Sequence, residues 1–429
     1  MFAAFALTPP SSFAQTTGKA VRHVRVEEDD PAWPPELTQA EANIQKNDCA
    51  AAEPLLRKVV ERDPANYLAW YDLGFVLNAL GKTEDSIAAY RKSVAAKPDV
   101  FESNLNLGLM LAKAGQPGAD QFLRAATSLK PTSNADEGRA RAWLSLAHVL
   151  EASKPGDAIE AYQQASQLQP KDVEPHLSAA PLLEQQNRFA EAEAQYKAAL
   201  ALNPSSSDAL AGLANLYMRG HRFTDAEAVL RKLVVLRPDD AATHMQLGRM
   251  LAADGQPDDA VVELQAALKL APGDAGVQRD LVDVYAAAGK YLEAEAQIRM
   301  LLAANPNDPG LHLLLGQTLL KGRKFPEAQQ ELLASVQLKP DSGPAYGDLA
   351  AAANENKNYP LVIKALDARA QFLPEIPATY FLRATAYDHL HQDKLAAQNY
   401  HRFLEVAGGR FPDQEWQARH RLIAIEPKK

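Results

Sequence analysis

Ten prolines recur along the chain at an almost constant spacing, and this period constrains the fold more than any other feature. Seven of the nine intervals between them are 34 residues, and the other two are 33 and 39 residues. A fixed period of this size is typical of a chain that stacks one supersecondary unit many times. We therefore expect a repeat array in place of one compact core. The recurring prolines are Pro64, Pro98, Pro131, Pro170, Pro204, Pro238, Pro272, Pro306, Pro340 and Pro374.

The residues between two recurring prolines predict a pair of helices. When the proline is numbered position 32, positions 4, 7, 8 and 11 fall on one helical stripe and positions 20, 24 and 27 on another. In the repeat that opens at Tyr67 these stripes include Trp70, Gly74 and Tyr90. Between the stripes many repeats carry a glycine such as Gly81, which can take the left-handed conformation that ends a helix. The recurring proline stops the second helix, so each unit is predicted to be helix A, a tight turn and helix B.

The pattern resembles the tetratricopeptide repeat, whose signature is an aromatic residue at position 4, Leu-Gly at positions 7 and 8, alanine at 20 and 27, and proline at 32. The repeat that opens at Ala241 carries the matching residues Leu247, Gly248, Ala260, Ala267 and Pro272. The resemblance covers about residues 33–408, or eleven units. It implies an all-α fold, a right-handed superhelical α-solenoid of antiparallel helix pairs. It also implies a non-enzymatic scaffold that binds a protein or peptide in its concave groove.

The period predicts five segments. Residues 1–14 contain a short apolar stretch followed by small residues before Gln15, which resembles the end of a secretory signal peptide; the alternative is a disordered tail. Residues 15–32 are expected to be a flexible linker, because they mix charges without an apolar face. Units 1–3 then occupy residues 33–131 and units 4–11 occupy residues 132–408, and residues 409–429 are expected to form a capping helix.

Two irregular places stand out. The polar segment 132–138 is extra to the period, and its composition predicts a surface loop that divides the array into three and eight units. The alternative is a tolerated insertion. At the C-terminus, the capping helix is expected to turn Trp416, Leu422 and Ile423 inward, because a terminal repeat needs its apolar end covered.

Composition limits the partners and the location. The net charge of −9 disfavours a nucleic-acid partner, since such proteins usually carry a basic excess. No apolar run reaches the length of a membrane span, so integral membrane insertion is not expected. The only cysteine, Cys49, is interpreted as a structural residue. The signal-like residues predict a periplasmic or secreted bacterial protein; without them the prediction is a cytoplasmic one.

Catalytic, metal and cofactor motifs are missing from the repeat frame. There is no phosphate-binding loop, nucleophile elbow, HExxH or CxxC sequence. His176, His244 and His312 all fall on position 4, which makes them packing residues of helix A. We therefore expect no catalytic residue, no metal, no cofactor and no enzymatic activity.

In tetratricopeptide arrays helix A lines the concave face, so the resemblance makes positions 2, 5, 9, 12 and 13 candidates for ligand contact. Three of these residues, Arg219, Arg249 and Arg279, come from successive units and are predicted to form a cationic track for an acidic partner. The alternative is that they are solvated or paired with acids. The candidates are Tyr71, Phe75, Asn78, His148, Glu151, Glu184, Asn215, Arg219, Arg249, Arg279, Asp283, Gln317, Lys321 and Asn354.

Two other functions are compatible with the same pattern. The array could be the recognition or regulatory subunit of a separate enzyme system, such as a glycosyltransferase or a secretion or assembly machinery. It could also be a structural scaffold that associates with itself.

Overall fold

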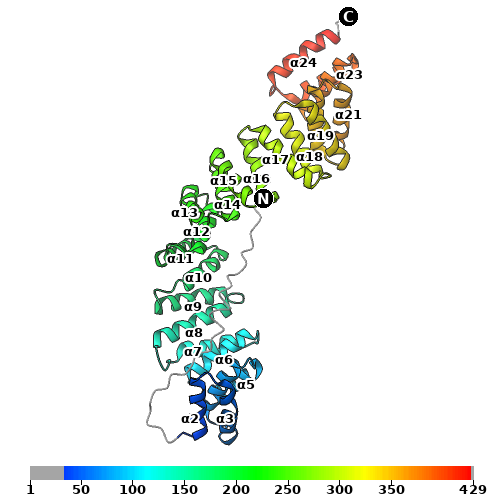
Figure 1. Cartoon of the computed structure of the whole chain (residues 1–429). Helices are drawn as coiled ribbons and strands as arrows, with labels where there is room; N and C mark the ends of the chain where they lie inside the picture. Colours follow the sequence, from blue (N-terminus) through cyan, green and yellow to red (C-terminus); the bar gives the residue numbers. More distant parts are fainter. Residues whose placement is uncertain (1–32, 427–429) are drawn as a thin grey trace. The chain divides into compact units, whose positions relative to one another are not determined.

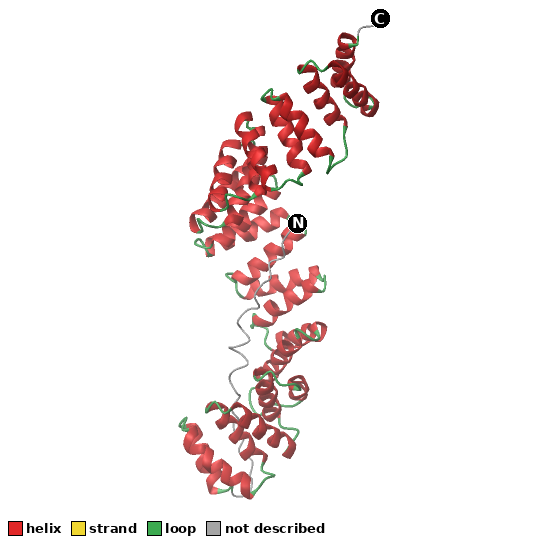
Figure 2. Ribbon diagram, turned by 90° about the vertical axis from the view of Figure 1, so that its right-hand side faces the viewer, coloured by secondary structure: helices red, strands yellow, loops and turns green. Residues whose placement is uncertain are grey.

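The computed structural model describes residues 33–426, and these residues form helices joined by short turns (Figures 1 and 2). The predicted signal peptide and linker at residues 1–32 lie outside the described residues. The described part contains 23 helices and no strand, so the all-α prediction is confirmed. None of these helices is both long and apolar enough to cross a membrane.

The helices alternate between the predicted A and B types. Even-numbered helices from α2 to α22 are helices A, odd-numbered helices from α3 to α23 are helices B, and α24 follows the last repeat. Their bounds are α2 (Pro35–Gln45), α3 (Cys49–Arg62), α4 (Tyr67–Ala79), α5 (Thr83–Ala96), α6 (Phe101–Lys113), α7 (Ala119–Ser128), α8 (Ala135–Leu150), α9 (Pro155–Leu168), α10 (Glu174–Gln185), α11 (Phe189–Leu202), α12 (Ser207–Arg219), α13 (Phe223–Leu236), α14 (Ala241–Ala253), α15 (Pro257–Leu270), α16 (Ala275–Ala287), α17 (Tyr291–Ala304), α18 (Pro309–Lys321), α19 (Phe325–Leu338), α20 (Gly343–Glu355), α21 (Tyr359–Ala370), α22 (Pro377–His389), α23 (Asp393–Ala407) and α24 (Pro412–Ile425).

The chain divides into two compact parts, and the boundary in the sequence lies between Gly220 and His221. The first part contains α2 to α12 and the second contains α13 to α24. Within each part, every helix packs against the next one in the chain, so the repeats form a continuous stack. The division that the sequence suggested at residue 131 lies inside the first part, where α7 packs directly on α8.

Helices A and B approach closely because small residues occupy position 8. A Cβ atom added to Gly316 of α18 would lie 2.5 Å from the side chain of Leu332 on α19. A Cβ atom on Gly74 of α4 would lie 2.9 Å from the ring of Tyr90 on α5. At Gly74 and Gly316, only glycine leaves room for the side chain that packs from position 24.

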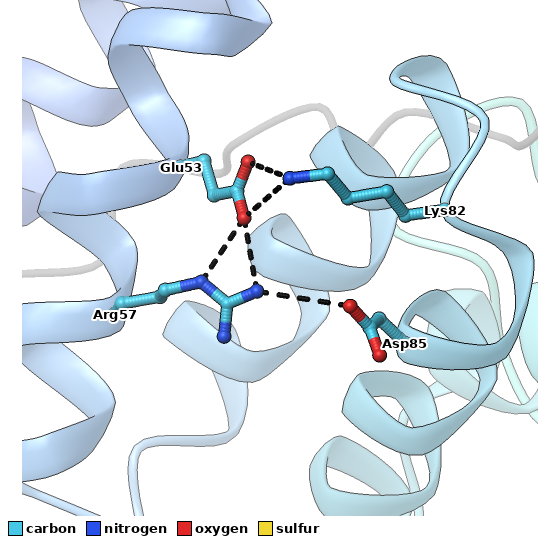
Figure 3. Close-up of polar contacts among 4 residues, drawn as sticks. All are labelled: Glu53, Arg57, Lys82 and Asp85. Carbon is cyan, nitrogen blue, oxygen red and sulfur yellow. Dashed lines mark hydrogen bonds and ion pairs between the residues drawn. The ribbon is translucent and has the colours of Figure 1, made fainter.

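Ion pairs join helix B of one repeat to the turn of the next repeat. Figure 3 shows Glu53 of α3 between Arg57 of the same helix and Lys82, which precedes α5. The Lys82 Nζ atom lies 2.7 Å and the Arg57 Nη2 atom 2.9 Å from the Glu53 carboxylate. Arg57 also lies 3.9 Å from Asp85. The Glu53 side chain is only 14% exposed, so this cluster is partly shielded from water. It connects helix B of the first repeat to the turn of the second.

The predicted surface loop at residues 132–138 is wrong for its second half. Ala135 begins α8, so Asp136, Glu137 and Gly138 form an additional first turn of that helix. Acidic residues are favourable there because the N-terminus of a helix carries partial positive charge. The remaining residues are also fixed, since the backbone N–H of Thr132 donates to Glu102 at 2.8 Å.

The capping helix exists as α24, but two of its three predicted inward residues are wrong. Leu422 is buried, whereas Trp416 is 60% exposed and Ile423 is 72% exposed. The face that α24 turns inward is also set by a polar contact, which the apolar pattern did not show. The Arg421 guanidinium makes two hydrogen bonds to Asp388 of α22, at 2.6 and 2.7 Å.

Candidate functional site

The even-numbered helices form the inner layer in each part. Contacts join α2 with α4, α6 with α8 and α10 with α12 in the first part, and α14 with α16 and α18 with α20 in the second. No two odd-numbered helices of residues 33–426 come as close together. In a curved stack, the layer whose helices lie closer together is on the inside, so helices A provide the inner surface of each part. We call this surface the inner layer.

Side chains at position 4 hold the start of helix A against the recurring proline. In four repeats a ring or amide nitrogen at this position lies within hydrogen-bond distance of the carbonyl oxygen of the proline six residues earlier. This shared contact explains why a nitrogen-bearing side chain suits the position. The pairs are Trp70 with Pro64 at 3.0 Å, Asn104 with Pro98 at 2.8 Å, His244 with Pro238 at 3.0 Å and His312 with Pro306 at 2.9 Å.

The position-4 histidines are structural, as the sequence predicted. The second ring nitrogen of His244 lies 2.7 Å from Glu263, and that of His312 lies 2.7 Å from Glu331. His176 lies 2.6 Å from Gln195 in the same arrangement. Within residues 33–426 no three His, Cys, Asp or Glu side chains gather in a way that could hold a metal ion.

Tyr71 and His148 were predicted to contact a ligand, and this prediction is wrong in one respect: both side chains are buried. Tyr71 is 1% exposed, because its ring packs edge-on against Tyr90 at 5.7 Å. Its hydroxyl accepts a hydrogen bond from Asn106 at 3.1 Å. His148 is 8% exposed and packs against Tyr162 at 5.5 Å. Burial lowers the pKa of His148 to about 4, so this histidine is neutral at pH 7.

An acidic cluster lies beside His148. Glu151 accepts a hydrogen bond from the Tyr162 hydroxyl, and burial raises its pKa. Glu174 lies 3.5 Å from His148, measured between Oε1 and Nε2. Burial, with the charges of Asp172 and Glu151 adding to it, raises the pKa of Glu174 to about 7. Glu151 was predicted for the inner layer, whereas Glu174 was missed although it occupies position 2.

Arg219 is engaged within the first part. Its Nη1 atom donates to Glu184 at 3.2 Å, and its guanidinium lies 5.0 Å from the ring centre of Phe189. Glu184 also accepts from the Tyr196 hydroxyl at 2.8 Å. The predicted residues Phe75, Asn78 and Asn215 are half-buried on the same layer.

Arg249 and Gln317 are engaged within the second part, by contacts of the same kind. The Arg249 Nε atom donates to Asp280 at 2.6 Å, and the Gln317 amide donates to Asp348 at 2.7 Å. Each bond joins position 9 of one helix A to position 6 of the next. The signal in the sequence is an aspartate 31 residues after a donor, and sequence analysis missed it. These bonds connect neighbouring helices of the inner layer.

Four predicted residues of the second part present polar groups on the inner layer. Arg279, Asp283 and Lys321 are exposed, and Asn354 is half-buried. Partial burial of its carboxylate raises the pKa of Asp283. The three arginines of the predicted cationic track therefore differ: Arg279 has no ion pair among residues 33–426, while Arg219 and Arg249 each bond a carboxylate.

Comparison with known proteins agrees with this architecture. Two family models, both described as tetratricopeptide repeat, match residues 37–101 and 76–134 and residues 182–247 and 251–318. Together these ranges cover more than half of the chain. No curated protein sequence matches it.

Several solved structures share the fold at low identity. YrrB, described as a TPR protein with an unusual peptide-binding site, is 24% identical, with 44% of this chain and 96% of YrrB covered and a TM-score of 0.39. PilF of Pseudomonas aeruginosa is 20% identical, with 50% and 97% covered and a TM-score of 0.39. The C-terminal part of a TPR repeat-containing protein from Cytophaga hutchinsonii is 14% identical, with 57% and 99% covered and a TM-score of 0.48.

Proposed function

The chain belongs to the tetratricopeptide-repeat family, and on that premise we propose that it is a non-enzymatic scaffold whose inner layer binds a protein or peptide. The observation that supports this most is the set of exposed and half-buried polar groups on successive helices A of the second part. Arg279 and Asp283 lie on α16, Lys321 on α18 and Asn354 on α20. Polar groups on rigid helices can fix the orientation of an extended ligand without a deep cavity.

The charge of the partner follows from which cations are free. Arg219, Arg249, Arg279 and Lys321 are all exposed, but Arg219 and Arg249 are paired with carboxylates, which leaves Arg279 and Lys321 as the predicted cations without an ion pair among residues 33–426. We propose that an acidic group of the partner contacts these two residues. Arginine suits this contact because its planar fork matches a carboxylate.

Site-specific photo-cross-linking in lysate of the native host tests the proposed surface. A photoreactive amino acid replaces Lys321 on the inner layer or, as the control, Lys364 on α21 of the outer layer; both residues are exposed. We expect one partner to be cross-linked from position 321 and not from position 364, and mass spectrometry identifies it. Equal cross-linking from both positions, or none from either, would overturn the proposal.

The acidic character of the partner has its own test. With the cross-linked partner purified, we expect R279A together with K321A to weaken its binding about tenfold, the loss of two partly exposed charged contacts. R249A serves as the matched control, because this arginine already bonds Asp280. An unchanged affinity of the double variant would contradict an acidic contact at these residues.

The location is proposed from residues 1–14 alone. We propose export to the periplasm or the medium, since these residues resemble the end of a signal peptide. Sequencing the N-terminus of the mature protein tests it: a start near Gln15 agrees with export, and an intact Met1 contradicts it.

A self-associating scaffold is the second candidate, because Trp416 and Ile423 are exposed on the last helix of the stack. Light scattering over a concentration series separates this candidate from a monomer. We expect W416S together with I423S to lower any association that is found.

A further inference from the structure

The irregular junction between the third and fourth repeats contains a cavity of its own. α7 has 10 residues, whereas the helices B before and after it, α5 and α9, have 14 each. α8 has 16 residues, whereas α6 has 13. A cavity of about 510 Å³ lies at this place in the first part, lined by α7, α8 and α9. We call it the junction cavity, and its polar walls are Arg124, Trp143, Asp157, Glu160, Gln163 and Gln164.

Trp143 differs from Trp70, the other tryptophan at position 4, because the insertion moves its proline away. Trp70 donates its indole N–H to Pro64, six residues earlier. The residue six before Trp143 is Glu137, which lies inside α8, where its carbonyl group serves the helix itself. The indole N–H of Trp143 has no hydrogen-bond partner among residues 33–426. The half-buried ring packs against the apolar core and lines the cavity, and its N–H donor is unused.

One carboxylate at the junction cavity, that of Glu160, has no ion-pair partner among residues 33–426. Arg124 and Asp157 neutralise each other, with Nη2 and Oδ2 2.6 Å apart. The charge of Glu160 helps to raise the pKa of Arg188, after the larger effect of Glu191, but the Arg188 guanidinium is already bonded to Glu191 at 2.8 Å.

We propose that the junction cavity binds a basic side chain, a guanidinium or an ammonium group, presented by a protein partner. An indole face attracts cations, and the attraction is strongest for tryptophan among the aromatic residues. The Glu160 carboxylate supplies the opposite charge, and the amide oxygens of Gln163 and Gln164 can accept the remaining N–H groups. The cavity is lined by α7, α8 and α9 and includes none of the residues predicted to contact a partner on the inner layer, so the proposal is independent of the function proposed there.

Fluorine NMR of protein labelled with fluorotryptophan tests this proposal directly. The chain has four tryptophans, and W143F assigns the resonance of interest. The probes are acetylated, amidated pentapeptides of sequence Gly-Ser-X-Ser-Gly, in which X is arginine, lysine, glutamine or glutamate. We expect the arginine and lysine peptides to shift the Trp143 resonance saturably, in the millimolar range, and the glutamine and glutamate peptides to leave it unchanged.

Two internal controls keep the result interpretable. The Trp70 resonance should not move, because its N–H is bonded to Pro64. E160Q should weaken the binding that the arginine-induced shift reports at least about threefold, since it removes the carboxylate charge from an exposed position of the cavity. The proposal is overturned if the Trp143 resonance stays fixed up to the solubility limit of the peptides, if all four peptides move it equally, or if E160Q responds like the parent.

Discussion

In ten of the eleven repeats position 15 adopts a left-handed backbone conformation, whether or not the residue there is glycine. The φ angle is 72° at Gly289, 59° at Arg323 and 57° at Lys357. A residue with a Cβ atom pays about 1–2 kcal/mol for this conformation, and glycine does not. The packing of helix A on helix B therefore imposes the turn, and the local sequence only makes it easier or harder.

Replacing Lys357 by glycine should stabilise the protein. The gain should be about 0.5–1 kcal/mol, because the relief of strain exceeds the extra entropy of an unfolded glycine. Urea unfolding followed by circular dichroism measures it as a higher midpoint. The matched control is Gly289→Ala, which should lower the midpoint because it introduces the same strain; a K357G midpoint equal to or below that of the parent would contradict this account.

The closest approach in the first part lies at Gly212 of α12. A Cβ atom there would lie 2.2 Å from the Tyr196 ring, so Gly212→Ala should destabilise by about 1–3 kcal/mol through overpacking. Gly156→Ala on α9 is the control, since its Cβ atom would meet nothing nearer than 4.0 Å. The control should be neutral or stabilising, because alanine favours a helix. Thermal unfolding distinguishes the two substitutions, and similar effects would rule out packing as the cause.

Glu174 should make stability fall as the pH rises. Its pKa is raised from 4.5 to about 7, so the folded protein holds this proton more tightly than the unfolded chain does. The stabilising contribution is complete below pH 4.5 and is lost as the pH passes through 7. Glu174→Gln should therefore match the parent near pH 5 and exceed it near pH 8 by about 1 kcal/mol, since the side chain is partly exposed. Urea midpoints at both pH values measure this difference, and an equal gain at both would exclude titration as its source.

The repeat period shows which residues belong to a buried stripe, but it does not fix how the neighbouring positions are used. Tyr71, at position 5, was predicted to meet a ligand and instead packs on Tyr90. Whether position 5 faces the ligand or helix B depends on the side chain at position 24 and on the angle between the helices. Both are tertiary properties that one helix's pattern does not contain, and the burial of His148 against Tyr162 has the same origin.

At the scale of helices, the ion cluster of Figure 3 occurs a second time in the other part of the chain. Glu295 of α17 bonds Arg299 at 2.9 Å and Lys324 at 2.8 Å, with the same spacing in the sequence as Glu53, Arg57 and Lys82. Sequence reasoning attended to the apolar stripes and missed this pattern. A glutamate, a basic residue four positions later and a lysine 29 positions later would have revealed it.

A double-mutant cycle measures how strongly this contact joins two repeats. Glu53→Gln and Lys82→Gln should show a coupling free energy of about 0.5–1 kcal/mol that shrinks in high salt, as for a partly exposed pair. Lys82 and Arg57 hold the pKa of Glu53 below its ordinary range, so the contribution is present above pH 4.5 and lost on acidification. Urea unfolding gives the four free energies. A coupling free energy near zero at low salt would show that the ion pair does not stabilise the contact between the two repeats.

At the scale of the whole molecule, stability in a stacked array is local. Each helix contacts mainly its neighbours in the chain, so a loss at one end is felt there first. The terminal helix α24 stabilises the end of the array, since Leu422 joins the apolar cluster of the last repeat and Arg421 bonds Asp388.

Deleting residues 411–429 should loosen the last repeat and leave the first ones intact. Without α24, Phe403 and Ala407 of α23 lose the cover that Leu422 provides, and Asp388 loses its bond to Arg421. Hydrogen exchange with mass spectrometry should show faster exchange in α22 and α23, by about tenfold or more for a local loss above 1.4 kcal/mol, and no change in α4 and α5. Trp416→Ser is the matched control, because this exposed ring should not contribute to the cover. Faster exchange throughout the chain would instead mean that the repeats unfold as one cooperative body.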